Sequence, residues 1–313
     1  MTPLISIVMV TRNGAATLPD TLAALQRQRI DAPWELIAID SGSTDGTRDL
    51  LEQAGARVVS IAPDTFNHGL TRNLGVEHAR GELVVLLVQD ARPASDDWLA
   101  HLVAPLRDNA RVAGAYCRQT PRPDATALTR LYLERWSGTS TTPRRVELED
   151  PSALDRLPPL ARMERCTFDN VCSCIRRSVW VDTPFAATTI AEDLEWARAV
   201  LQQGHALVFA ADATVVHSHD RPASYEFWRT WLLHRRLFEL FGVRTIPRVS
   251  DLLRSIASCV RLHLRCEREA RAAGGQTMPP GRALALAVAW PLGQYLAGLS
   301  ASRGWAPPRV RGV

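Results

Sequence analysis

The 313-residue sequence contains no lysine, so arginine supplies all 37 of its basic residues. This absence excludes mechanisms that depend on a lysine side chain, such as a P-loop phosphate clamp, a kinase strand lysine or Schiff-base catalysis. A GC-rich genome is the simplest cause of the bias. Every arginine stays protonated at working pH and presents a planar guanidinium that suits phosphate or carboxylate groups.

Cysteine is also used sparingly. The six cysteines form no C-x-x-C pair and are too few for a disulfide scaffold, so we expect a reducing compartment. Cys172 and Cys174 have no second Cys or His pair to complete a tetrahedral site, which argues against zinc. The strand-like run over residues 4–10 has neither a basic region before it nor a cleavage site after it. We therefore expect no secretion signal and a cytoplasmic location.

What is present fits a globular protein, with 46% apolar and 22% charged residues. Charge is distributed unevenly. Residues 221–313 carry 15 Arg against 5 Asp and Glu, whereas residues 1–220 carry 22 Arg against 28 acids. We expect an acidic catalytic body over residues 1–220 and a helical basic tail over residues 221–313. Such a tail suits an anionic partner.

Short β-rich runs alternate with helical patterns over the first 120 residues, which predicts βαβ units and a mostly parallel sheet of the α/β class. The predicted strands cover residues 5–11, 34–40, 57–61, 82–88 and 112–117. Residues 120–165 have little periodicity, so we expect an irregular insertion. A helix from about residue 191 to 204, a strand over 206–216 and further helices are predicted beyond it.

Three polar residues follow predicted strands. Thr11, Asp40 and Asp90 each lie at the carboxyl end of a strand, where open α/β sheets bind ligands. Thr11 and Asp40 could equally be turn formers or helix caps. Asp90 follows so apolar a strand that a carboxylate there needs a partner, which a metal ion or a phosphate-bearing ligand would supply.

Two further pairs could take part in chemistry. Glu192 and Asp193 open a predicted helix, where acids complement the helix dipole; such a pair could also hold a general base near an incoming hydroxyl. His217 and His219 point to one face if the strand stays extended. A histidine beside Asp90 is a reasonable additional metal ligand.

At this point the sequence resembles the family 2 glycosyltransferases, and most closely their bacterial rhamnosyltransferase-like branch. The resemblance spans about residues 4–240. Its motifs are V-M-V-T-R-N at 8–13, D-S-G-S-T-D-G-T at 40–47, F-N-H-G at 66–69, T-R-N-L-G at 71–75, Q-D-A at 89–91, N-V-C-S at 170–173, A-E-D-L-E-W at 191–196 and H-S-H at 217–219.

The resemblance implies a GT-A fold, a nucleotide-diphosphate sugar donor, a divalent cation and inversion at the anomeric carbon. Carried over by position, it assigns Thr11 and Asp40 to the nucleobase and ribose, and Arg72 to the nucleotide or its diphosphate. It further implies donor binding by three residues in the same motifs, which are Asn13, Asn73 and Gln89.

The same resemblance places Asp90 where the family's D-x-D motif supplies a metal ligand. The Q-D-A form keeps one carboxylate where the fuller motif has two, so Mg²⁺ or Mn²⁺ would rest on Asp90 and the diphosphate, with His217 or His219 as an addition. Asp193 matches the catalytic base, and Glu192 would support it.

Residues 283–302 carry no charge and are bracketed by Arg282 and Arg303. Their length would fit a membrane span, but Pro291 and several small or polar residues dilute the segment. A helix lying in the membrane interface or packed on the body are the other possibilities. An interfacial tail would suit an enzyme at the inner face of the cell membrane with a lipid-linked saccharide as acceptor.

The sequence therefore predicts an inverting, metal-dependent glycosyltransferase of cell-surface polysaccharide synthesis, with rhamnose the best candidate sugar and a saccharide or lipid-linked saccharide as acceptor. One alternative is a sugar-phosphate nucleotidyltransferase, although the Gly-rich, lysine-bearing loop of such enzymes is missing. Another is a non-catalytic protein that binds anionic membranes. The acidic body and the lack of basic-aromatic strands argue against a nucleic-acid partner.

Overall fold

The computed structural model describes residues 5–305 in two compact units. The first unit contains residues 5–120, 137–157 and 165–217, and the second contains 121–136, 158–164 and 218–305. Residues 306–313 of the predicted tail and Leu4 of the family resemblance lie outside the described residues.

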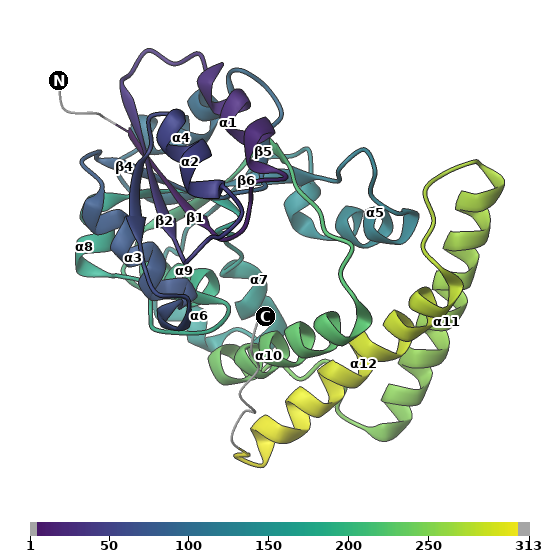
Figure 1. Ribbon diagram of the computed structural model, residues 1–313. Coiled ribbons are helices and arrows are strands. Elements are labelled where there is room, and N and C mark those ends of the chain that lie inside the picture. Colours follow the sequence, from purple (N-terminus) through teal and green to yellow (C-terminus); the bar gives the residue numbers. More distant parts are fainter. Residues whose placement is uncertain (1–4, 306–313) are drawn as a thin grey trace. The chain divides into compact units, whose positions relative to one another are not determined.

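A nine-stranded mixed sheet organises the first unit (Figure 1). Its strands are β1 (Ile5–Thr11), β2 (Trp34–Asp40), β3 (Arg57–Ser60), β4 (Leu83–Val88), β5 (Arg92–Pro93), β6 (Val112–Thr120), β7 (Arg144–Val146), β8 (Cys172–Arg176) and β9 (Ala206–Val216). Their order is β3-β2-β1-β4-β8-β6-β9-β5, and β7 pairs with β9. The predicted bounds of β1, β2 and β9 are confirmed.

The sheet is parallel over β3, β2, β1 and β4, as the alternation of strands and helices predicts. β8 differs, because it lies antiparallel between β4 and β6. β6 and β9 are again parallel to each other. Consequently the carboxyl ends of β1, β2 and β4 lie at one edge of the sheet. The carboxyl ends of β6 and β9 also lie next to each other.

The helices of the first unit are α1 (Leu18–Gln26), α2 (Thr47–Gln53), α3 (His68–His78), α4 (Trp98–Asp108), α6 (Ala153–Arg156), α8 (Arg177–Asp182) and α9 (Glu192–Gln202). The sheet and α4 share a core in which Ile7, Met9, Val85, Trp98 and Leu102 are fully buried. β4 is the most apolar predicted strand, and its residues from Leu83 to Leu87 are buried. The central position expected for that strand is therefore observed.

Residues 120–165, which we expected to be irregular, contain regular elements. These are α5 (Ala127–Glu134), the 3-10 helix η2 (Ser137–Thr139), β7, α6 and α7 (Pro159–Arg165). Elements of three to eight residues span at most about two helical turns, too few for hydrophobic periodicity to stand out in the sequence.

The second unit is helical (Figure 1). In addition to α5 and most of α7, it contains α10 (Ala223–Phe241), α11 (Val249–Ala272) and α12 (Pro280–Ser302). Leu128, Met278, Ala283 and Leu286 form a small core. α12 approaches α10 closely, because a Cβ placed on Gly293 would lie 2.9 Å from the carbonyl oxygen of Phe227.

Within residues 5–305, α12 alone has the length and apolar composition of a membrane span, and half of its most apolar window is buried. It therefore satisfies the length criterion while also packing on α10 and α11 as a core helix.

Two cysteines meet in the first unit. Cys117 on β6 and Cys172 on β8 are linked as a disulfide, whereas the low cysteine count predicted a reducing compartment. The pairing follows from strand register: β6 and β8 are antiparallel, with Tyr116 opposite Ser173, so the next residues along also face each other. Sequence spacing alone carries no information on that register.

Candidate functional site

The first part of the site lies at the ends of β1 and β2. Thr11 and Asp40 are paired in the parallel register, and the Thr11 hydroxyl donates to Asp40 Oδ1 at 3.2 Å. Asp40 is fully buried. Its Oδ2 accepts hydrogen bonds from the backbone N–H groups of Gly42 and Ser43, and its Oδ1 also accepts from the Ser43 hydroxyl. These donors stabilise the carboxylate and fix the loop that follows β2.

The loop after β1 is fixed by its neighbours. Asn13 has a positive φ of 47°, a conformation in which Asn is enriched, and its Oδ1 accepts from the backbone N–H of Thr44 at 2.9 Å. Gln89 bonds both ways to Arg12: its Oε1 accepts from the Arg12 N–H, and its Nε2 donates to the Arg12 carbonyl. The structure thus brings Thr11, Asn13 and Asp40 together with Gln89.

A buried ion pair forms a second group. Arg72 on α3 and Glu192 at the start of α9 are 3.0 Å apart, with side chains 8% and 5% exposed. The side-chain Nδ2 of Asn170 donates to Glu192 Oε1 at 3.2 Å, and the backbone carbonyl of Asn170 accepts from Arg72 at 3.4 Å. Burial acts to raise the pKa of Glu192, but the charges of Arg72 and His68 and the bond from Asn170 offset it, so the pKa is lowered overall.

Asp193 follows Glu192 in the first turn of α9. Its Oδ1 accepts from the backbone N–H of Leu194 at 2.8 Å, and its Oδ2 accepts from the backbone N–H of Asn170 at 3.3 Å. Burial, together with the charges of Glu192 and Asp169, raises the pKa of Asp193 well above its usual value. Two adjacent acids therefore differ: one is held ionised by a cation, and the other holds its proton more tightly, as a general base needs.

The backbone before these acids has an unusual conformation. Ala191 has φ of 62° and ψ of 32°, the left-handed region that a non-glycine residue enters at a cost of about 1–2 kcal/mol. Trp196 and Ala197 anchor the following turn of α9 in the core. Packing therefore sets the direction in which Glu192 and Asp193 leave the chain.

Asn73, predicted to bind the donor, uses its whole amide inside the protein. Its Nδ2 donates to the Phe185 carbonyl at 2.8 Å, and its Oδ1 accepts from the Phe185 N–H at 3.0 Å and from Trp180 Nε1 at 2.8 Å. Arg72 is likewise engaged by Glu192, His68 and Asn170. Donor contacts for both residues stay predictions.

The predicted metal ligands include a close pair. Asp90 Oδ1 and His217 Nε2 are 3.8 Å apart, and their side chains are 15% and 12% exposed. His219, an exposed residue of the second unit, follows His217 by two positions. Because two residues of chain span at most about 7 Å, the backbone of His219 stays near His217. A carboxylate oxygen suits Mn²⁺ or Mg²⁺, and an added imidazole nitrogen favours Mn²⁺.

Three residues of the site were not assigned a role from the sequence. Asn170 belongs to a quoted motif, yet only the structure shows that it contacts Arg72, Glu192 and Asp193. Asp169, next to it, contributes to the raised pKa of Asp193. Gln119 is a buried polar residue of β6. The predicted strand ends at residue 117, three residues before the observed end of β6, so no sequence signal marks Gln119 as a buried strand residue.

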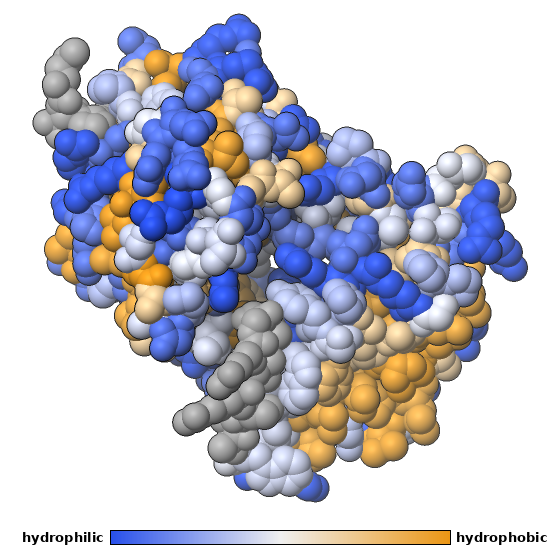
Figure 2. All heavy atoms as spheres, viewed as in Figure 1, coloured by the Kyte–Doolittle hydropathy of each residue, from blue (hydrophilic) through white to orange (hydrophobic). Residues whose placement is uncertain are grey.

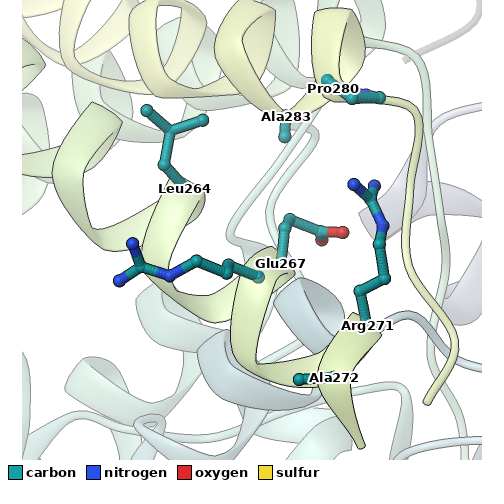
Figure 3. Close-up of a pocket in the computed structure, with 7 residues that line it drawn as sticks. Leu264, Glu267, Arg271, Ala272, Pro280 and Ala283 are labelled. Atoms are coloured by element: carbon teal, nitrogen blue, oxygen red, sulfur yellow. The ribbon is translucent and has the colours of Figure 1, made fainter. Parts of the chain in front are cut away.

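A pocket of about 580 Å³ lies in the second unit and contains none of the predicted site residues. Glu267 and Arg271 extend from α11 beside Pro280 and Ala283 of α12 (Figure 3). Glu267 Oε2 accepts from the backbone N–H of Met278 at 3.0 Å. Burial raises the pKa of Glu267. This carboxyl therefore ties the loop between α11 and α12 to α11.

Comparisons with known proteins agree with these motifs. The family model of glycosyl transferase family 2 matches residues 6–172. The O-antigen chain rhamnosyltransferase WbaN of Salmonella anatum is 31% identical over 72% of this chain and 70% of its own length. The O-antigen chain rhamnosyltransferase RfbN of Salmonella typhimurium is also 31% identical, over 72% and 69%.

A solved structure supports the fold. The mannosyltransferase PcManGT from Pyrobaculum calidifontis, determined in complex with GDP-Man and Mn²⁺, superposes with a TM-score of 0.59 over 96% of this chain and 88% of that one. Its sequence identity is 19%, so the likeness concerns the fold. Motifs, site geometry and these relatives agree: the chain is a glycosyltransferase with a GT-A fold, and it belongs to glycosyl transferase family 2.

Proposed function

We propose that the protein is an inverting, metal-dependent glycosyltransferase that moves a sugar, with rhamnose the best candidate, from a nucleotide-diphosphate donor to a hydroxyl of a saccharide or lipid-linked saccharide in cell-surface polysaccharide synthesis. The observation that carries this proposal is the pair of unlike acids at the start of α9, one ionised against Arg72 and one with a raised pKa. The two O-antigen rhamnosyltransferases among its relatives favour rhamnose.

Asp193 is the proposed catalytic base. It accepts the proton of the acceptor hydroxyl as that oxygen attacks the anomeric carbon from the face opposite the diphosphate. General-base catalysis of this kind contributes about 10²–10⁴-fold to the rate. Glu192 stays ionised beside Arg72, and its negative charge keeps the proton affinity of Asp193 high. One displacement inverts the anomeric centre.

The donor site in this proposal uses the loops after β1, β2 and β4, which are hydrogen-bonded to one another. Thr11 and Asp40 face the nucleobase and ribose, with Asn13 and Gln89 holding the adjoining backbone. Because Asp40 accepts two backbone N–H bonds and Gln89 accepts one and donates another to backbone, this part of the site is preorganised before the donor binds.

Asp90 and His217 are the proposed ligands of a divalent cation, with His219 as a third candidate. An oxygen donor and an imidazole nitrogen 3.8 Å apart, both largely buried, fit Mn²⁺ better than Mg²⁺, which prefers oxygen ligands. When bound, such an ion offsets the negative charge that develops on the departing diphosphate. The neighbour PcManGT was determined with Mn²⁺.

We further propose that the second unit touches an anionic membrane at the cytoplasmic face. Exposed apolar side chains on α11 and α12 form what we call the apolar face, which consists of Val249, Leu253, Leu264, Leu284 and Val288. Figure 2 shows hydrophobic surface gathered over these helices. Exposed arginines on α11 are Arg254, Arg261, Arg265, Arg268 and Arg271. Apolar side chains beside arginines suit an anionic lipid interface.

A donor screen tests the proposal. The purified protein is incubated with dTDP-rhamnose, UDP-sugars or GDP-sugars, a saccharide acceptor and Mn²⁺ or Mg²⁺, and release of the nucleoside diphosphate is measured. We expect release with one donor, no pyrophosphate, and loss of turnover in Asp193→Asn with donor binding retained. Pyrophosphate as product would instead identify a nucleotidyltransferase. Turnover unchanged by Asp193→Asn would reject the base assignment.

A further inference from the structure

A buried glutamine, Gln119, contacts both Asp169 and the predicted metal ligand His217. Gln119 on β6 is 5% exposed, and its neighbours in the sheet are β8 on one side and β9 on the other. Its Nε2 donates at 2.5 Å to Oδ2 of Asp169, a residue that precedes β8. Its Oε1 lies 2.8 Å from Nδ1 of His217, which follows β9. Both amide atoms of Gln119 are therefore used, each toward a different strand.

The hydrogen-bonding capacity of these partners determines the orientation of the Gln119 amide and the hydrogen on one nitrogen of His217. An ionised carboxylate only accepts hydrogen bonds, so the NH₂ group of Gln119 must face Asp169. The carbonyl of Gln119 then faces His217 Nδ1, and a carbonyl also only accepts. Nδ1 must therefore carry a hydrogen. In a neutral imidazole the other nitrogen, Nε2, is then left with its lone pair.

Nε2 is the ring nitrogen of His217 that lies near the predicted metal ligand Asp90. His217 Nε2 lies 3.8 Å from Asp90 Oδ1, too far for a hydrogen bond between them. The His217 backbone is also held, because its N–H donates to the Thr120 carbonyl at 2.9 Å, next to Gln119 on β6. Metal-binding histidines commonly donate their other ring N–H to such a partner, which sets the tautomer.

We propose that Gln119 is a positioning residue that holds His217 in the Nδ1–H tautomer, so that its Nε2 is presented with Asp90 as a ligand pair for a divalent cation. The proposal rests on the metal site of the proposed function. It also ties that site to Asp169, whose other oxygen accepts from the Val171 N–H at 2.8 Å and whose charge contributes to the raised pKa of Asp193.

The tautomer can be measured without metal or substrate. Long-range ¹H–¹⁵N spectra of metal-free protein labelled at histidine nitrogens distinguish the Nδ1–H, Nε2–H and imidazolium forms, and His217→Gln identifies the signals of His217. We expect the Nδ1–H form in the wild type at neutral pH. A wild-type Nε2–H or imidazolium form would overturn the proposal.

Two variants at one position separate the contacts. Gln119→Met removes the acceptor, so we expect His217 to lose its single tautomer. Gln119→Glu keeps an acceptor toward Nδ1 and removes the donor to Asp169, so we expect Nδ1 to stay protonated. Gln203→Met, at the end of α9, is the matched control with a wild-type spectrum. A Gln119→Met spectrum identical to wild type would also overturn the proposal.

Binding of Mn²⁺ alone, followed by electron paramagnetic resonance, gives the second readout. Loss of such a second partner of a ligating histidine typically weakens metal binding about 10–100-fold, which we expect for Gln119→Met. Wild-type binding of Mn²⁺ unchanged in Gln119→Met would contradict the positioning role. A wild type with the Nδ1–H tautomer but no Mn²⁺ binding would reject the metal site while supporting the tautomer assignment.

Discussion

The ion pair at the site of the first unit is buried, whereas the arginines on α11 of the second unit are exposed. In the first unit, Arg72 and Glu192 are paired at 3.0 Å with almost no exposed surface, and Asn170 satisfies both. In the second unit, arginines such as Arg254 lie on the outside of α11, next to exposed leucines. Buried pairs fix geometry, as a chemical step requires, whereas exposed cations beside apolar side chains suit association with a surface.

The largest expected effect concerns the acids of the first unit. Asp193 must be unprotonated to act as a base, so turnover should increase as pH rises through its pKa. Because that pKa is raised, the increase should lie above about pH 4, where an ordinary aspartate titrates. Below that pKa the rate should fall about tenfold per pH unit. The pH dependence of nucleoside diphosphate release measures the limb. Asp212→Asn, an exposed change on β9, should leave it unmoved. A rate independent of pH would contradict the role of Asp193.

Breaking the buried pair tests the contrast directly. Arg72→Met leaves Glu192 without its cation, and loss of one partner of a buried pair costs about 3–5 kcal/mol of unfolding free energy. The control is Arg254→Met in the second unit, where Arg254 pairs with Asp251 on an exposed surface. That pair should contribute about 0–1 kcal/mol. Urea unfolding measures both. Equal losses would remove the distinction between the two units.

A half-buried histidine of the second unit, His234, extends the comparison to pH. Burial lowers the pKa of His234 on α10 to about 4 from 6.5. The unfolded chain binds a proton below about pH 6.5 while the folded protein does not, so the unfolding free energy should fall as pH drops from 6.5 to 4. A change in pKa from 6.5 to about 4 corresponds to about 3–4 kcal/mol in total, of which about 2 kcal/mol is lost by pH 5.

The measurement is the difference between wild type and His234→Gln in urea unfolding at pH 7.5 and pH 5. Subtracting the variant removes the carboxylates that titrate in the same range. A difference that does not change with pH would show that His234 is protonated alike in both states.

The smallest effect concerns the apolar face. Leu253→Glu combined with Leu264→Glu should reduce binding to vesicles containing anionic phospholipid about tenfold or more, and each Arg→Gln on α11 about fivefold. Sedimentation with vesicles measures the binding, and neutral phosphatidylcholine vesicles should bind less. Leu70→Glu and Val181→Glu, at exposed apolar residues of the first unit, are matched controls. Equal loss in these controls, or dimerisation through the apolar face, would reject the membrane assignment.

Local patterns predicted the strands that carry the site. β1, β2 and β9 have strong apolar runs, and their observed bounds match the predicted ones. The direction of β8 was not predictable, because a strand's sequence carries no mark of the neighbour it pairs with. The Cys117–Cys172 contact depends on that same register.

The site was predictable where residues lie in contiguous motifs, as Glu192 and Asp193 do. It was less so where contacts join distant segments. Gln119 and His217 are 98 positions apart, and Arg72 and Asn170 are also separated by 98. The first contact depends on the pairing of β6 with β9, and the second depends on the place of β8 beside β4, which emerges only when the sheet is assembled.

The left-handed backbone of Ala191 has a consequence for folding kinetics. An unfolded chain rarely places alanine at φ of 62°, and in the folded chain Trp196, five residues later, is buried in the core. We therefore expect the acids of α9 to acquire their orientation late, after the sheet has formed. A freshly folded chain would thus gain its secondary structure before it gains the capacity to turn over substrate.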